Sequence, residues 1–230
     1  MQLGDAPADT ERLARASRTL LARYATANWW PSRSRFEVMV GAVLVQNTRW
    51  ANVHRAIVAL RAAGLLQPGP MTAASVSDLT EVIRPAGCQT VKAVRLSHLA
   101  HGVAEAGGMR QLARLPTPAL RERLQSWHGV GEETADAILL FGFSRPMFIA
   151  DAYARRWLAR TGLFAAGSGG SAYRRCRHYV ERHLRWSTAD YQALHAAIVM
   201  HGQQHCATRA RCEACCSAEQ CLYLKQKVKE

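Results

Sequence analysis

Five cysteines near the end of the chain have a spacing that suits a metal centre. They are close together in the sequence: Cys206, Cys212, Cys215, Cys216 and Cys221. Without Cys216 the pattern is C-x5-C-x2-C-x5-C, which lets four thiolates surround one compact cofactor. Thiolates select zinc or an iron–sulfur cluster, and zinc ribbons usually have a longer central gap. Buried, unligated cysteines remain an alternative, and Cys216 could replace Cys215 as the third ligand.

A glycine-containing turn upstream could bind an anion. Residues 118–143 have the pattern of a helix, a short turn and a second helix, with Gly129, Val130 and Gly131 in the turn. Glycines let successive backbone N–H groups face outward, and the start of the second helix adds positive charge. Such a turn would hold a phosphate through the main chain without reading sequence. A plain structural connection between two helices explains the pattern equally well.

One carboxylate stands at the start of the next helix-like segment. Asp151 precedes AYARRWLAR and would be its N-cap. Capping alone is worth about 1 kcal/mol and is the simplest role. The same geometry would keep the carboxylate ionised and oriented by backbone N–H groups, as a group facing a developing cation requires.

The charge balance indicates a polyanionic partner. The chain has 30 Lys and Arg against 17 Asp and Glu, a net charge of +13. No polybasic run lies beside an amphipathic anchor, which favours nucleic acid over a membrane surface. The longest apolar stretches are about seven residues, and the start of the chain lacks the apolar region of a signal peptide. We therefore expect a cytoplasmic, nucleoid-associated protein with reduced cysteines and no membrane partner.

The elements that must position these residues are helical. Apolar residues recur at spacings of three and four, and no sustained alternation of period two is present. Ser34 and Glu37 form the pattern of a capping box before the apolar segment FEVMVGAVLVQ, which is apolar enough to be a buried helix. The fold class predicted from this pattern is all-α.

Taken together, the motifs resemble one known family. HGVGEETADAILL, the aspartate in FIADAYARRWLAR, and HGQQHC followed by three more cysteines occur in the order found in endonuclease III-like helix-hairpin-helix (HhH-GPD) DNA glycosylases. The resemblance covers roughly residues 29–224. It implies a six-helix barrel domain over 36–145 that contains the hairpin 118–143, and a discontinuous domain made of 1–35 and 146–230. It also implies a 4Fe-4S cluster in loop 206–221, although the family has a six-residue first gap where this chain has five.

The resemblance assigns roles to these residues. Asp151 would be the catalytic carboxylate, and the cluster ligands would be Cys206, Cys212, Cys215 and Cys221. Double-stranded DNA containing a damaged base would be the partner of a monomeric enzyme, with the damaged nucleotide flipped out of the helix. Family members that also cleave the strand have a lysine nucleophile at the position of Glu133. Glu133 cannot serve in that way, so the resemblance implies a monofunctional glycosylase without AP-lyase activity.

The segment before the capping box bears on the choice of base. Trp29, Trp30 and Pro31 resemble the bacterial 3-methyladenine glycosylase branch, and aromatic faces suit a cationic alkylated purine. The tryptophans could also be simple core anchors. In the family, Gln46 would fill the space left by the flipped nucleotide, and Cys88 would lie in the segment that wedges into the duplex. Alternatives are a glycosylase for mismatched uracil or thymine or for an oxidised pyrimidine, and an inactive cluster-containing DNA-binding protein.

Overall fold

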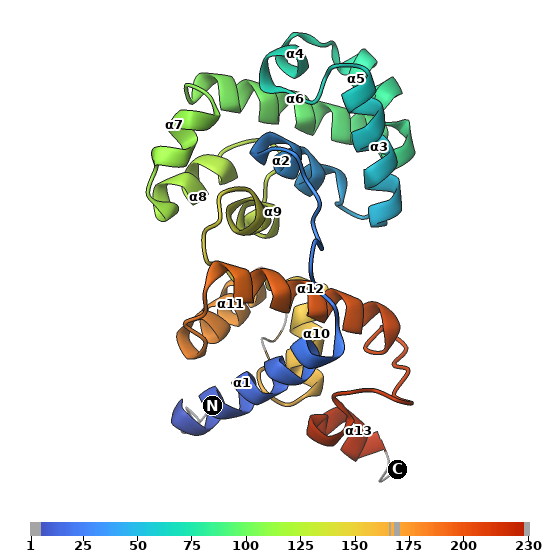
Figure 1. Cartoon of the computed structure of the whole chain (residues 1–230), viewed down its shortest axis with the longest axis vertical. Coiled ribbons are helices and arrows are strands. Elements are labelled where there is room, and N and C mark those ends of the chain that lie inside the picture. Colours follow the sequence, from blue (N-terminus) through green and yellow to red (C-terminus); the bar gives the residue numbers. More distant parts are fainter. Residues whose placement is uncertain (1–5, 166, 168–170, 228–230) are drawn as a thin grey trace. The chain divides into compact units, whose positions relative to one another are not determined.

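The computed structural model describes residues 6–165, 167 and 171–227, and all regular elements in these ranges are helical (Figure 1). The all-α prediction is therefore confirmed for this part of the chain. The chain forms two compact units. One comprises Trp30–Arg145, and the other comprises Met1–Trp29 together with Pro146–Glu230. No helix of the described residues is both long and apolar enough to cross a membrane.

The central unit, Trp30–Arg145, is built around one buried helix. Its helices are α2 (Arg35–Leu44), α3 (Trp50–Ala62), α4 (Pro68–Ala73), α5 (Val76–Val82), α6 (Gln89–Glu105), α7 (Met109–Arg114), α8 (Thr117–Gln125) and α9 (Glu132–Ala137). A 3-10 turn, η1 (Arg84–Ala86), and a π-helical segment, η2 (Ile138–Gly142), complete it. Helix α2 packs against α3, α6, α9 and η2, and every residue from Phe36 to Leu44 is buried. The apolar sequence of α2 thus forms core, as predicted.

The start of α2 shows half of the predicted capping box. The Glu37 N–H donates to the Ser34 hydroxyl at 3.1 Å, as expected. The Glu37 carboxylate, however, accepts from the Arg33 N–H at 3.3 Å instead of the Ser34 N–H, and its other oxygen pairs with Arg61 at 2.7 Å. The hydrogen bond to the Glu37 carboxylate thus comes from the N–H one residue earlier than expected, because the buried carboxylate also pairs with Arg61.

The predicted hairpin consists of α8, a turn over residues 126–131, and α9, which continues into η2. Arg121 of α8 joins the two helices because its guanidinium donates to both oxygens of the fully buried Asp136 carboxylate, at 2.7 and 3.2 Å. Bidentate pairs of this kind fix geometry as well as adding energy. This ion pair thus holds α8 and α9 together.

The terminal unit holds α1 (Ala6–Arg23), α10 (Ala152–Arg160), α11 (Ala172–His183), α12 (Thr188–Gln204), η3 (Ala218–Gln220) and α13 (Leu222–Lys227). Helix α12 packs against α1 and α10, α1 also packs against α11, and α10 packs against α13. Helix α10 buries Ala154, Trp157 and Leu158, a spacing of three and four that defines one apolar face. Segments from both ends of the chain therefore share one core.

Candidate functional site

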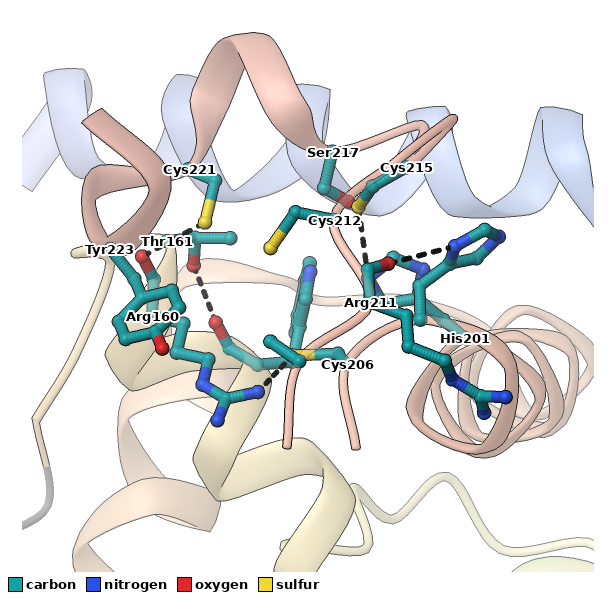
Figure 2. Close-up of a pocket in the computed structure, with 13 residues that line it drawn as sticks. Arg160, Thr161, His201, Cys206, Arg211, Cys212, Cys215, Ser217, Cys221 and Tyr223 are labelled. Carbon is teal, nitrogen blue, oxygen red and sulfur yellow. Dashed lines mark hydrogen bonds between the residues drawn. The ribbon is translucent and has the colours of Figure 1, made fainter. Parts of the chain in front are cut away.

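Four of the five clustered cysteines line one pocket in the terminal unit. Its lining includes the four cysteines predicted as ligands: Cys206, Cys212, Cys215 and Cys221 (Figure 2). The loop that carries them is short, so four thiols from a 16-residue segment surround one space. Cys216 is not part of this lining; its sulfur lies 3.9 Å from His201 Nδ1.

The chemistry of this pocket fits a sulfur-ligated cofactor. Among the described residues, no three His, Cys, Asp or Glu side chains converge on a point where a single metal ion would bind. A cluster differs from a single ion because each cysteine binds its own iron atom, so the thiolates are spread around the cofactor. Burial raises the pKa of the Cys215 thiol to about 11. A bound cation would therefore be needed to keep it as a thiolate at neutral pH.

The pocket also contains donors for sulfur. Arg160 Nη1 lies 3.4 Å from Cys206 Sγ and 2.7 Å from the Ala207 carbonyl, while Arg156 Nε donates to the Cys206 carbonyl at 2.6 Å. The Trp157 side chain, 1% exposed, lines the pocket, and its Nε1 has no hydrogen-bond partner among the described residues. These groups lie on α10, the helix that begins after Asp151. No local pattern in the sequence pointed to them, because they meet the cysteines across about 50 residues of chain.

Asp151 has the geometry that its position predicted. It is the N-cap of α10, it is 8% exposed, and its Oδ1 accepts the Ala154 N–H at 2.7 Å. Burial raises the pKa of the carboxyl to about 6, although the Ala154 N–H and Arg155 act to lower it. The carboxyl is therefore mostly ionised at pH 7, and its pKa is close enough to that pH for it to gain or lose a proton readily. The expectation from the sequence, that the N–H groups keep the carboxyl ionised, is therefore only partly met, because burial outweighs their effect on the pKa.

The hairpin turn offers fewer N–H groups than expected. Gly129 has φ +86°, and a β-carbon there would lie 2.3 Å from Cγ of Arg95, so the turn requires glycine. No hydrogen bond from the N–H of Gly129 or Gly131 occurs within the described residues. Val130 differs from the expectation, because it is buried and its N–H donates to the Trp127 carbonyl at 3.1 Å. Two of the three predicted donors are thus available to an anion.

Gln46 is bound to the hairpin. Its amide Nε2 donates to the Gly129 carbonyl at 3.0 Å and to the Thr134 hydroxyl at 2.9 Å, and its Oε1 accepts from Arg95. The side chain predicted to fill a gap in DNA therefore also links α6, the turn and α9. The Arg95 side chain packs next to Gly129 and orients this amide. No pattern in the sequence pointed to Arg95.

Two other predicted residues lie at exposed positions. Glu133 is the second residue of α9 and is exposed. Cys88 is exposed, precedes α6 in a left-handed conformation with φ 48°, and makes no side-chain cap. A non-glycine residue in that conformation is uncommon and marks a tight turn.

The predicted aromatic segment is split between the two units. Trp29 ends the first segment of the terminal unit, whereas Trp30 opens the central unit and Pro31 is exposed. The Trp30 ring lies 5.1 Å from the ring of Trp50 and 4.9 Å from that of Phe141, with all three half-buried. The Trp30 ring also lies against α2 at Gly41, where a β-carbon would be in ordinary van der Waals contact with the indole at 3.4 Å. The partners of Trp30 come from positions that no spacing rule connects.

Comparisons with known proteins agree with this architecture. Residues 40–181 match the HhH-GPD superfamily base excision DNA repair proteins. A provisionally named DNA repair glycosylase of Methanocaldococcus jannaschii is 37% identical over 215 residues, which cover 92% of this chain and 96% of that protein.

Two solved structures have the same fold. The 3-methyladenine DNA glycosylase of H. pylori bound to 1,N6-ethenoadenine has a TM-score of 0.72 at 26% identity, covering 85% of this chain and 97% of that one. An endonuclease III–DNA complex has a TM-score of 0.79 at 18% identity, covering 96% and 99%. The resemblance inferred from the motifs is confirmed: the chain belongs to the HhH-GPD superfamily of base excision DNA repair glycosylases.

Proposed function

We propose that this glycosylase is monofunctional: it hydrolyses the N-glycosidic bond of a damaged base without cleaving the strand. The observation that carries the proposal is the buried, backbone-anchored carboxylate of Asp151, together with Glu133 at the hairpin position that resembles the lyase lysine. Glu133 has no amine with which to form a Schiff base, so the sugar must react with water.

In the proposed reaction, the C1′–N bond breaks and its electron pair leaves with the base. The sugar then carries positive charge, which the ionised Asp151 stabilises from the N-terminus of α10. Water adds to C1′ and transfers a proton to the Asp151 carboxylate, which later releases it to the solvent. A carboxylate with a pKa of about 6 can accept a hydrogen bond from that water near neutral pH.

The proposed substrate class is an alkylated purine. The Trp30 ring lies beside the rings of Trp50 and Phe141, and all three are half-buried. Such rings can stack on a flat, cationic base. An alkylated purine already carries positive charge and needs little help from an acid to leave. The solved 3-methyladenine glycosylase with bound ethenoadenine supports this choice of base.

The proposed cofactor is a 4Fe-4S cluster held by Cys206, Cys212, Cys215 and Cys221 around their common pocket. Bound there, a cluster would tie the loop together through four sulfur–iron bonds. Double-stranded DNA would be held through phosphates at the Gly129 and Gly131 N–H groups, with the overall charge of +13 adding affinity.

The test is a panel of duplexes that carry one methylated, deaminated, mismatched or oxidised base. The enzyme is incubated with each duplex, and half of each reaction is then treated with alkali. We expect scission after alkali only, strongest for the methylated purine. Scission without alkali, or a complex trapped by borohydride, would contradict the monofunctional assignment. Strongest activity on a pyrimidine would contradict the proposed substrate class alone.

A variant at position 133 tests separately whether the absence of lyase activity is due to the absence of an amine there. Glu133→Lys places an amine at the exposed second position of α9 and leaves Asp151 unchanged. We expect borohydride to trap some of this variant on DNA with an abasic site and none of the wild type. Equal trapping of both proteins would mean that another amine serves as the nucleophile.

A further inference from the structure

Trp157 carries a buried donor that the described protein atoms do not satisfy. Its side chain is 1% exposed, and its Nε1 has no partner in the part of the chain that the structure describes. Buried polar groups in proteins are nearly always hydrogen-bonded, so an exception calls for an explanation. An indole N–H can only donate, so its missing partner must be an acceptor.

The surroundings of this side chain indicate which acceptor. Trp157 lines the pocket that the four cysteines surround. Neighbouring donors already have partners: Thr161 donates to the Trp157 and Leu158 carbonyls, and Arg160 reaches Cys206 Sγ and the Ala207 carbonyl. Cysteine sulfur is the commonest acceptor among the side chains that line this pocket.

We propose that the Trp157 indole N–H donates a hydrogen bond to a sulfur of the 4Fe-4S cluster and raises the reduction potential of that cluster. The inference rests on the proposed cofactor. Reduction adds negative charge to the cluster sulfurs, so a donor aimed at them stabilises the reduced form more than the oxidised form. Hydrogen bonds to sulfur and exclusion of solvent are two of the factors that set cluster potentials.

Trp157→Phe tests this, because phenylalanine keeps an aromatic ring in the core and removes the N–H. Both proteins are purified with their cluster and titrated electrochemically while the visible absorption is followed. At the wild-type midpoint potential we expect the ratio of oxidised to reduced cluster in the variant to rise about tenfold. For a one-electron couple this is a midpoint about 59 mV lower. Trp186→Phe, the same change at a half-buried site outside the pocket lining, should leave the midpoint unchanged.

A second measurement uses the unaltered protein and so does not depend on how the variant folds. Tryptophan labelled with 15N at the indole nitrogen is incorporated, and pulsed electron paramagnetic resonance is recorded on the cluster in its paramagnetic state. We expect a 15N coupling, with an exchangeable proton on the same nitrogen. Absence of both signals, or an unchanged midpoint in a Trp157→Phe protein that holds its cluster, would overturn the hydrogen bond alone. Protein without iron would overturn the proposed cofactor and this inference with it.

Discussion

Replacing Asp151 with asparagine should stabilise the protein while removing most of its activity. The carboxyl is buried at the N-cap of α10, and burial raises its pKa from the ordinary 3.8 to about 6. Asparagine has nearly the same volume, and its oxygen can accept the Ala154 N–H as the carboxylate does. Asn is as good an N-cap as Asp, so the cap itself contributes little to the difference.

The size and pH dependence of the gain in stability follow from the raised pKa. The folded protein holds a proton on Asp151 up to about pH 6, whereas the unfolded chain releases it near pH 3.8. Stability is therefore lost as the pH rises through this window, and at pH 7 the full penalty of about 3 kcal/mol is present. Asp151→Asn avoids it, so the free energy of unfolding at pH 7 should rise by about that amount. The advantage should disappear as the pH is lowered to about 4.

Thermal unfolding measures this directly. For a chain of this length, 1 kcal/mol shifts the Tm by about 2 to 4 °C, so we expect the variant to melt roughly 6 to 12 °C higher at pH 7. Excision should fall at least about 100-fold, the usual scale for removing one electrostatic group from a transition state. An unchanged Tm of the variant at pH 7 would show that the buried Asp151 carboxylate does not lower the stability of the folded protein. Excision at the wild-type rate would show that it is only a cap.

Three further predictions concern the cofactor, the hairpin and the base pocket. Purified protein should be brown with about four iron atoms per chain by elemental analysis, and a colourless protein with one zinc would contradict the cluster. Gly129→Ala should lower the Tm and weaken duplex binding, because its β-carbon meets Arg95 at 2.3 Å. Gly131→Ala, with open space around its β-carbon, should keep the wild-type Tm. Trp30→Ala should slow excision of alkylated purines about 5- to 100-fold while binding to undamaged duplex changes little, and equal losses would make Trp30 a core residue.

Features set by local chemistry were predictable from the sequence. The helical periodicity, the buried α2 and the cap at Asp151 each depend on residues within one or two turns of one another. The cysteine loop was predictable for the same reason, since its four thiols lie on one short segment and line one pocket.

Features set by contacts between distant segments were not predictable. Arg160 and Trp157 meet the cysteine loop from α10, and Trp30 meets Phe141 across more than 100 residues. The Val130 N–H was assigned to an anion, yet the turn uses it for the Trp127 carbonyl. The Asp151 pKa also depends on burial of the carboxyl, which no local pattern in the sequence records.

The most direct test of the central claim is chromatography of the bases released from a methylated DNA duplex. With wild-type enzyme we expect free methylated purine to accumulate while the strand stays intact until alkali is added. With Asp151→Asn under the same conditions, we expect release to fall at least about 100-fold. If the wild-type enzyme releases no base from any damaged duplex, the protein is not a glycosylase. If both proteins release base equally, Asp151 is not the catalytic carboxylate.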